Sequence, residues 1–64
     1  MAARRARPDH LWTMDELAKY LRVPVRTLYH WNYRQTGPPA YRIGRELRFD
    51  PRDVWEWMQH HTTD

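Results

Sequence analysis

The sequence predicts a mostly α-helical domain with one β-hairpin, in the order helix, helix, hairpin, helix. Three observations predict this order. Two short segments with apolar side chains at helical spacing flank a proline-containing turn at residues 22–24. A glycine-centred stretch at 41–49 then alternates like a hairpin, and an Asp-Pro pair opens a third helical pattern at residue 50. With 64 residues and no cysteine, the chain forms one small domain held without disulfides.

The first helix is predicted over about residues 14–21. Thr13 and Glu16 form a T-x-x-E capping box before it, in which each side chain accepts a hydrogen bond from the other residue's backbone N–H. Upstream, residues 1–10 are small and charged with no apolar period, so we expect a disordered basic arm there. The folded domain is accordingly expected at 11–62.

The second helix is predicted from Pro24 or Val25 to about Arg34. Proline is tolerated in the first turn of a helix because its missing N–H would have no partner there. Leu28 and Trp31 stand three residues apart and form the buried stripe. Two short helices joined by a three-residue turn make a helix-turn-helix.

The hairpin is predicted over residues 41–49, with Gly44 in its turn. A two-residue loop would mix apolar and charged side chains on each face, whereas a three-residue loop at 44–46 separates them. The apolar side chains that the longer loop places on one face are Tyr41, Ile43, Leu47 and Phe49. Arg42 and Arg48 would then lie opposite each other on the other face.

The third helix is predicted to begin with Asp50 as its N-cap and Pro51 as its first residue. Its buried stripe, at i, i+3, i+4, i+7 spacing, consists of Val54, Trp57, Met58 and His61. Trp55 points away from this stripe. It either covers the base of the hairpin as part of the core, the interpretation we favour, or is an exposed anchor for a protein partner next to Glu56. With the hairpin as its wing, the whole is a winged helix-turn-helix.

Basic and acidic side chains are segregated along the chain. Residues 17–48 carry seven Lys and Arg side chains against Glu46 alone, a net charge of +6, whereas residues 49–64 carry −3. Such a basic middle predicts a polyanionic partner on one face. Genome base composition also produces arginine-rich proteins, but it does not explain this segregation, so we favour the polyanion.

The arginines of the hairpin are the candidate contacts of the wing. They are Arg42, Arg45 and Arg48. Like charges directly opposite each other destabilise a strand pair, so the expected Arg42–Arg48 pair predicts an anion across it. A DNA phosphate fits this role, and an arginine inserted into a minor groove is the variant. The alternative is a solvated face whose arginines only prevent edge aggregation.

The outward face of the second helix supplies the candidate major-groove contacts. The side chains left outside the buried stripe are Val25, Arg26, Tyr29, His30 and Tyr33. Arg26 is expected to read guanine, Val25 to touch a thymine methyl and Tyr29 to donate to a phosphate. His30 is expected to contact a phosphate or a base. Arg34, at the end of the helix, is either a phosphate contact or a partner of the helix dipole.

The residues form no constellation for catalysis or metal binding. The sequence has no serine or cysteine, and the acidic side chains at 50–56 occupy capping and dipole positions. His60 and His61 are adjacent and diverge by about 100° on a helix, so they do not share one ion. We therefore expect no enzyme activity, no cofactor or metal and no small-molecule ligand. Without a long apolar run or a signal-peptide h-region, the chain is expected to be cytoplasmic and to avoid membranes.

Several segments also resemble the small MerR-like helix-turn-helix domains of phage and integrative-element excisionases. They lie at 17–21 (LAKYL), 23–31 (VPVRTLYHW), 37–45 (GPPAYRIGR) and 53–57 (DVWEW). The likeness covers about residues 11–58. The side chains that it assigns to a recognition helix are Arg26, Thr27, Tyr29 and His30, and those that it assigns to the wing are the three hairpin arginines. Three positions depart from the family pattern, with Pro24 for a frequent serine N-cap, Arg22 for a frequent turn glycine and Glu46 for a frequent basic residue.

This resemblance implies a recombination directionality factor. Such proteins bind several short sites beside an attachment site, often cooperatively, bend the double-stranded DNA and direct an integrase towards excision. The separation of charge further predicts that the acidic third helix of one copy docks on the basic wing of the next, head to tail. Two alternatives stay open. One is a small MerR-like transcriptional regulator, and the other is a protein-interaction adaptor that uses Trp55 and the acidic helix.

Overall fold

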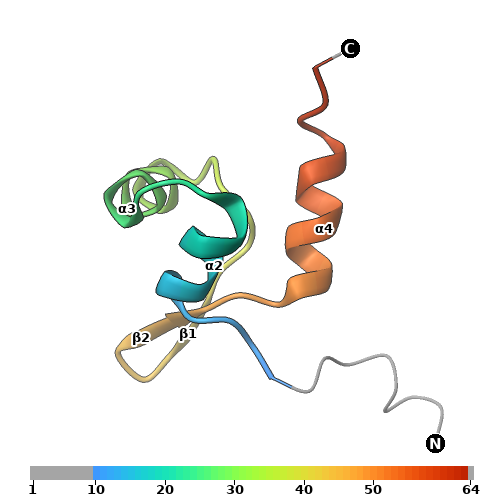
Figure 1. Ribbon diagram of the computed structural model, residues 1–64. Coiled ribbons are helices and arrows are strands. Elements are labelled where there is room, and N and C mark those ends of the chain that lie inside the picture. The colour runs from blue at the N-terminus through green and yellow to red at the C-terminus, as the bar shows by residue number, and fades with distance from the viewer. Residues whose placement is uncertain (1–9, 64) are drawn as a thin grey trace, which may run out of the picture.

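The predicted order of helix, helix, hairpin, helix is confirmed in the computed structural model, which describes residues 10–63 (Figure 1). Its elements are α2 (Met14–Leu21), α3 (Val25–Arg34), β1 (Tyr41–Ile43), β2 (Glu46–Arg48) and α4 (Pro51–Gln59). The two strands form an antiparallel hairpin, the wing of a winged helix-turn-helix. The arm expected at residues 1–10 lies outside the described part of the chain except for His10, so its bounds and those of the domain stay predictions.

Two of the three helices in residues 10–63 begin at caps made by neighbouring side chains. The hydroxyl of Thr13 accepts from the backbone N–H of Glu16 at 3.1 Å, and the carboxylate of Glu16 accepts from that of Thr13 at 2.9 Å. Asp50 accepts from the backbone N–H of Arg52 at 2.9 Å as α4 begins. Helix α3 differs, because its N-cap is Pro24 and offers no side-chain bond. The capping box and the Asp-Pro start predicted from the sequence are both confirmed.

The turn between α2 and α3 depends on Arg22, whose backbone is left-handed (φ 59°, ψ 43°). The N–H groups of Arg22 and Val23 both bond to the carbonyl of Ala18, which closes the end of α2. A side chain in this conformation costs about 1–2 kcal/mol, which glycine avoids. The chain therefore keeps the tight turn at the position where the excisionase resemblance leads us to expect glycine.

The core lies where α2, α3, the end of β2 and α4 meet. Its buried apolar side chains are Met14, Leu17, Ala18, Leu28, Phe49 and Val54. The backbone of Phe49 also exchanges two hydrogen bonds with that of Trp12, at 2.8 and 2.9 Å. This bridge fixes the segment before α2 beside the end of the wing.

The register of the hairpin corrects the sequence-based prediction. The Cα partners are Tyr41 with Arg48, Arg42 with Leu47, and Ile43 with Glu46. The loop therefore consists of Gly44 and Arg45 alone, and the three-residue loop was wrong. Gly44 has φ 65°, and a positive φ at the first loop residue is what a type II′ turn requires. The expected Arg42–Arg48 pair does not form, because Arg42 shares a face of the hairpin with Leu47.

The parity argument failed because the core takes its apolar side chains from only one strand of the hairpin. Leu47 packs against the core and Phe49 is buried, while Tyr41 and Ile43 are 46% and 56% exposed. Tyr41 has a polar partner outside the core, since its hydroxyl donates to Asp53 Oδ2 at 3.0 Å. This bond joins the wing to the first turn of α4.

The bond between wing and α4 predicts a pH dependence of stability. Asp53 raises the pKa of Tyr41 above 10.0, first by accepting its hydrogen bond and then by its charge. The bond therefore stabilises the fold below about pH 10, and this stability is lost as the pH rises through the raised pKa. We expect Tyr41→Phe to lose less free energy of unfolding than the wild type above that pH, measured by urea denaturation at each pH. Tyr33→Phe, at an 86% exposed side chain, should keep the wild-type profile, and matching profiles for wild type and Tyr41→Phe would contradict the prediction.

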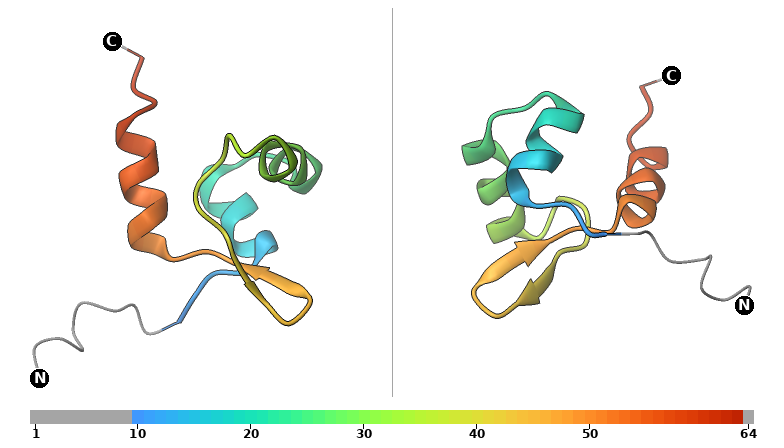
Figure 2. Two further views of the ribbon diagram at one scale, coloured as in Figure 1. Left: turned by 180° about the vertical axis from the view of Figure 1, so that it is seen from behind. Right: turned by 60° about the horizontal axis from the view of Figure 1, so that its bottom comes forward.

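Helix α4 stands to one side of α2 and α3 in Figure 1 and in both views of Figure 2. Besides the fully buried Val54, Trp57 joins it to the rest of the fold. The Trp57 indole N–H donates to the carbonyl of Thr36 at 3.3 Å, and its ring lies 5.7 Å from that of Trp31. The loop after α3 is therefore held against α4 through this tryptophan pair.

Two expectations for α4 are wrong. Trp55 is 59% exposed, so it is not part of the core. His61 lies beyond Gln59, the last residue of α4, and is exposed. Its ring stacks 4.2 Å from that of Trp57 instead of entering the core.

Candidate nucleic-acid interface

Helix α3 turns a cationic and aromatic face away from the core. The side chains exposed on this helix are Arg26, Tyr29, His30, Tyr33 and Arg34. Leu28 faces the opposite way and is buried. Tyr29 and Tyr33 stand four residues apart, hence on the same side of the helix. The sequence-based prediction of which side chains point outward holds for these residues.

Two other candidate contacts of α3 are less accessible. Val25 is half-buried and packs against the core, so the expectation that it points outward is wrong. Thr27 is also half-buried. Part of each side chain remains accessible at the first turn of the helix.

The three arginines of the wing have different surroundings. Arg45 is exposed in the two-residue loop at the tip. Arg48 donates to the carbonyl of Leu47 at 3.0 Å and lies 3.7 Å from the carboxylate of Glu46, which partly neutralises it. Arg42 is exposed on the other face, beside Leu47. The wing therefore presents two cations without an acidic partner in the described residues and one cation with such a partner.

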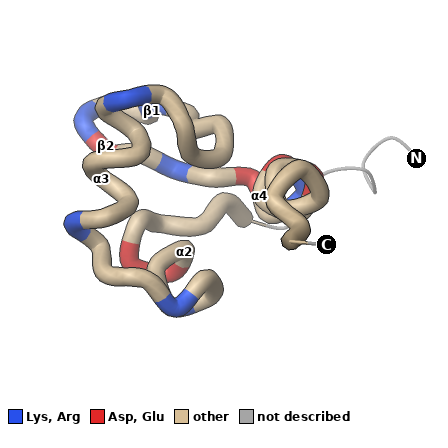
Figure 3. Tube along the Cα trace, turned by 90° about the horizontal axis from the view of Figure 1, so that it is seen from above, with Lys and Arg blue, Asp and Glu red and all other residues tan. Residues whose placement is uncertain are grey.

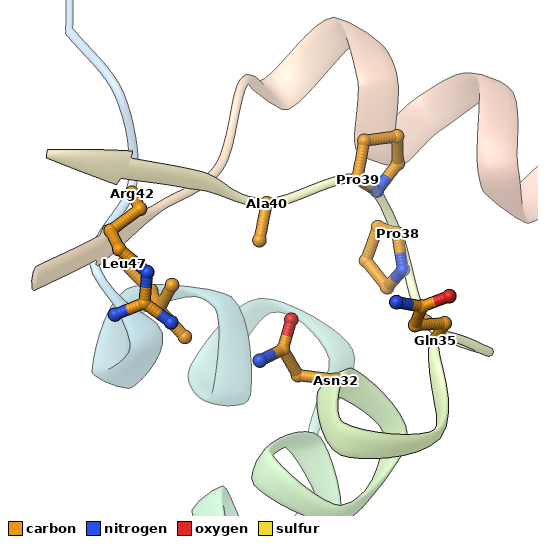
Figure 4. A pocket seen from close by; sticks show the side chains of 8 residues that line it. Asn32, Gln35, Pro38, Pro39, Ala40, Arg42 and Leu47 are labelled. Carbon is orange, nitrogen blue, oxygen red and sulfur yellow. The ribbon is translucent and has the colours of Figure 1, made fainter.

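A groove runs between α3 and the wing, and it brings these groups together. One part of it is lined by Tyr29 of α3 and all three wing arginines, together with the acidic Asp15 and Glu46. The adjoining part lies beside the loop after α3 (Figure 4). Both parts are lined by Arg42, Leu47 and Asn32. Asn32 was not among the residues predicted from the sequence. Its helix propensity is no lower than that of most residues of α3, so the sequence carried no signal for it.

Figure 3 shows how charge is distributed over the backbone. Lys and Arg positions predominate along the hairpin and on α3, although Glu46 lies in β2. Asp and Glu positions lie on α4 and at the start of α2, each of which also carries one basic residue, Arg52 and Lys19. The basic middle segment predicted from the sequence thus falls mainly on α3 and the wing. A polyanion in the groove between α3 and the wing would lie among the basic positions.

The exposed face of α4 carries the remaining candidates, Trp55 and Glu56. A shallow groove beside them is bounded by Gly37, Pro39, Asp53, Glu56, Trp57 and His60. No cluster of His, Asp or Glu side chains within residues 10–63 is arranged to hold a metal ion. In the same range, no helix has the length and apolarity needed to span a membrane.

A family model described as a helix-turn-helix domain matches residues 13–62 of the chain. The match runs from the capping threonine of α2 to beyond the end of α4 and contains every candidate contact. No curated protein and no solved structure matches the chain.

Proposed function

The chain belongs to the helix-turn-helix domain family, which binds DNA, and from this premise we propose how it engages the double helix. Helix α3 enters the major groove, and the wing contacts the neighbouring backbone and minor groove. One observation carries this proposal. Tyr29 of α3 and the three wing arginines line a single groove, so one DNA duplex can reach both elements at once.

The proposed roles follow from position and chemistry. Arg26 reads guanine, since it is exposed in the first turn of α3. Arg45 at the wing tip enters the minor groove. The further contacts from α3, to phosphates or base edges, are Thr27, Tyr29, His30 and Arg34. Arg48 contributes less charge than the other wing arginines because of its pairing with Glu46.

We further propose that the protein is an excisionase, which coats several short sites beside an attachment site and assists an integrase. Two considerations support this role. The four segments at 17–57 resemble excisionases. One helix and one wing also cover only a few base pairs, so specificity requires repeated sites or a partner.

Adjacent copies would associate head to tail through α4 and the wing. The groove beside α4 is lined by Trp57 and Pro39 and by the acidic Asp53 and Glu56. The wing of the next copy offers an exposed Ile43, with Arg48 on the same face of the hairpin as the cation, so that Arg45 remains available to the minor groove. An apolar side chain with a neighbouring cation matches a groove lined by apolar and acidic side chains.

A gel-shift titration on the attachment-site DNA of the protein's own element, at several salt concentrations, tests both levels of the proposal. Wild type should give a ladder of cooperative shifts. The logarithm of its binding constant should fall with the logarithm of the salt concentration at a slope of about −5, as expected for about six phosphate contacts. Glu56→Arg should abolish the cooperative ladder and leave the affinity for a single site unchanged, because it reverses charge at the groove rim away from α3.

Gln59→Arg is the control for added positive charge on the same helix outside that groove, with a change of one charge where Glu56→Arg changes two. Cooperativity that survives Glu56→Arg would exclude the head-to-tail contact. A single shift at a promoter, with none at the attachment site, would favour a transcriptional regulator. The absence of any salt-dependent shift would refute the proposed DNA binding and favour an adaptor that uses the exposed Trp55.

A further inference from the structure

The groove between α3 and the wing is lined by two polar side chains that face each other. Arg42 extends from β1 and Asn32 from α3, and both point into the space beside Leu47 and Ala40 (Figure 4). The two-residue turn creates this arrangement, since it moves Arg42 to the Leu47 face of the hairpin. The predicted three-residue loop would have turned it away from α3.

Neither side chain is satisfied within the fold. In residues 10–63, the guanidinium of Arg42 makes no hydrogen bond or ion pair, and neither does the side-chain amide of Asn32. Arg48, on the opposite face of the same hairpin, has both a carbonyl and a carboxylate partner. The part of the groove beside the loop after α3 is lined by Arg42 and by no acidic side chain of the described chain.

The end of α3 does not repel an anion at this place as strongly as a free helix end would. The carbonyl of Asn32 accepts the N–H of Gln35 at 3.1 Å, and the carbonyl of Trp31 accepts the N–H of Thr36 at 2.9 Å. Carbonyls occupied in this way present less negative charge to the groove. The Gln35 side chain borders the same space and adds a second amide.

We propose that this groove is a binding site for one DNA phosphate, held by the Arg42 guanidinium and the Asn32 amide. The inference rests on the proposed DNA binding and deepens it. A helix in the major groove and a wing in the adjacent minor groove lie on either side of one sugar–phosphate strand. That strand must pass between α3 and the wing, where Arg42 and Asn32 face it.

The site positions the protein and reads no sequence. A guanidinium and a phosphate form paired, charge-assisted hydrogen bonds, while an amide supplies one further donor. Because every nucleotide carries a phosphate, loss of these contacts weakens binding equally on all DNA sequences. This distinguishes Arg42 from Arg26, whose proposed contact is with a base.

A scan with methylphosphonates, which replace one charged phosphate by a neutral group, tests the site. Wild type should bind less tightly when any one of several phosphates of its target is replaced. The loss should be about tenfold where the phosphate's partner is an arginine. The affinity of Arg42→Gln should be unchanged by replacement of one of these phosphates. Replacement of each of the others should weaken its binding as much as in the wild type. Its fold should be unaffected, since Arg42 makes no internal bond, and thermal denaturation by circular dichroism checks this.

The salt dependence of binding gives an independent readout. Arg42→Gln should reduce the log–log salt slope by about 0.9, whereas Arg42→Lys should keep the slope and lose only affinity. Asn32→Ala should weaken binding about three- to tenfold at an unchanged slope, because it removes a neutral donor. Lys19→Gln removes the same charge from an exposed position of α2 outside the groove and should leave the methylphosphonate pattern unchanged.

The outcomes separate this site from the proposed function. If wild type shows no salt-dependent DNA binding, the proposed function fails and the phosphate site fails with it. If wild type binds but Arg42→Gln keeps its sensitivity at every phosphate, the site alone is excluded. A uniform loss of sensitivity at all phosphates would likewise overturn it.

Discussion

Leu17→Ala is expected to remove a large part of the protein's free energy of unfolding. Leu17 is fully buried at the centre of α2, among the core side chains of α3, α4 and the end of the wing. Truncating a buried leucine costs about 2–5 kcal/mol, because it removes apolar contacts and leaves a cavity. A domain of this size has a total stability of about 3–10 kcal/mol. The free energy of unfolding, measured by urea denaturation followed by circular dichroism, should fall by about 2–5 kcal/mol.

Lys19→Ala is the matched control on the same helix. The side chain of Lys19 is exposed and makes no hydrogen bond or ion pair in the described structure. Its truncation should therefore change the free energy of unfolding by less than about 0.5 kcal/mol. A Leu17→Ala variant as stable as Lys19→Ala would show that α2 does not form the centre of the core.

Arg26→Gln is expected to have the largest effect on sequence-specific binding. An arginine that pairs with the O6 and N7 acceptors of guanine discriminates against other bases by about 1–3 kcal/mol, or roughly five- to 150-fold. The variant should lose this much affinity for the target and less for unrelated DNA. The specificity ratio, from titrations of both duplexes at one salt concentration, is the quantity to compare.

Arg34→Gln removes an equal charge from the last turn of the same helix and serves as the comparison. As a phosphate contact, Arg34 would contribute equally to target and unrelated DNA, so its variant should keep the wild-type specificity ratio. As a partner of the helix dipole, it would contribute to stability instead. An unchanged specificity ratio in Arg26→Gln would refute base reading by this arginine.

The parts of the fold predicted correctly are those decided by neighbours in the chain. The start of α2 follows from a hydrogen-bonded pair three residues apart, and the start of α4 from Asp50 and the proline after it. The outward face of α3 follows from the helical period once Leu28 is assigned to the core. Such interactions require no knowledge of the rest of the molecule.

The hairpin register and the environment of Trp55 were predicted incorrectly because both depend on distant elements. Apolar parity favoured burying Tyr41, but its hydroxyl bonds to Asp53, twelve residues away. The exposure of Trp55 follows from where α4 lies relative to α2 and α3, which the helical period does not specify.

The sequence by itself determined the order of the elements, the helix starts, the family resemblance and the basic character of α3 and the wing. Only the tertiary structure decided which arginine faces α3 and which is paired with Glu46. It also revealed Asn32, which lines the same groove as Arg42 only once α3 and the wing have come to lie on either side of it. The physical reason is the range of the interactions. Caps and helical faces are set within a few residues, whereas a groove is made by side chains that meet only after the chain has folded.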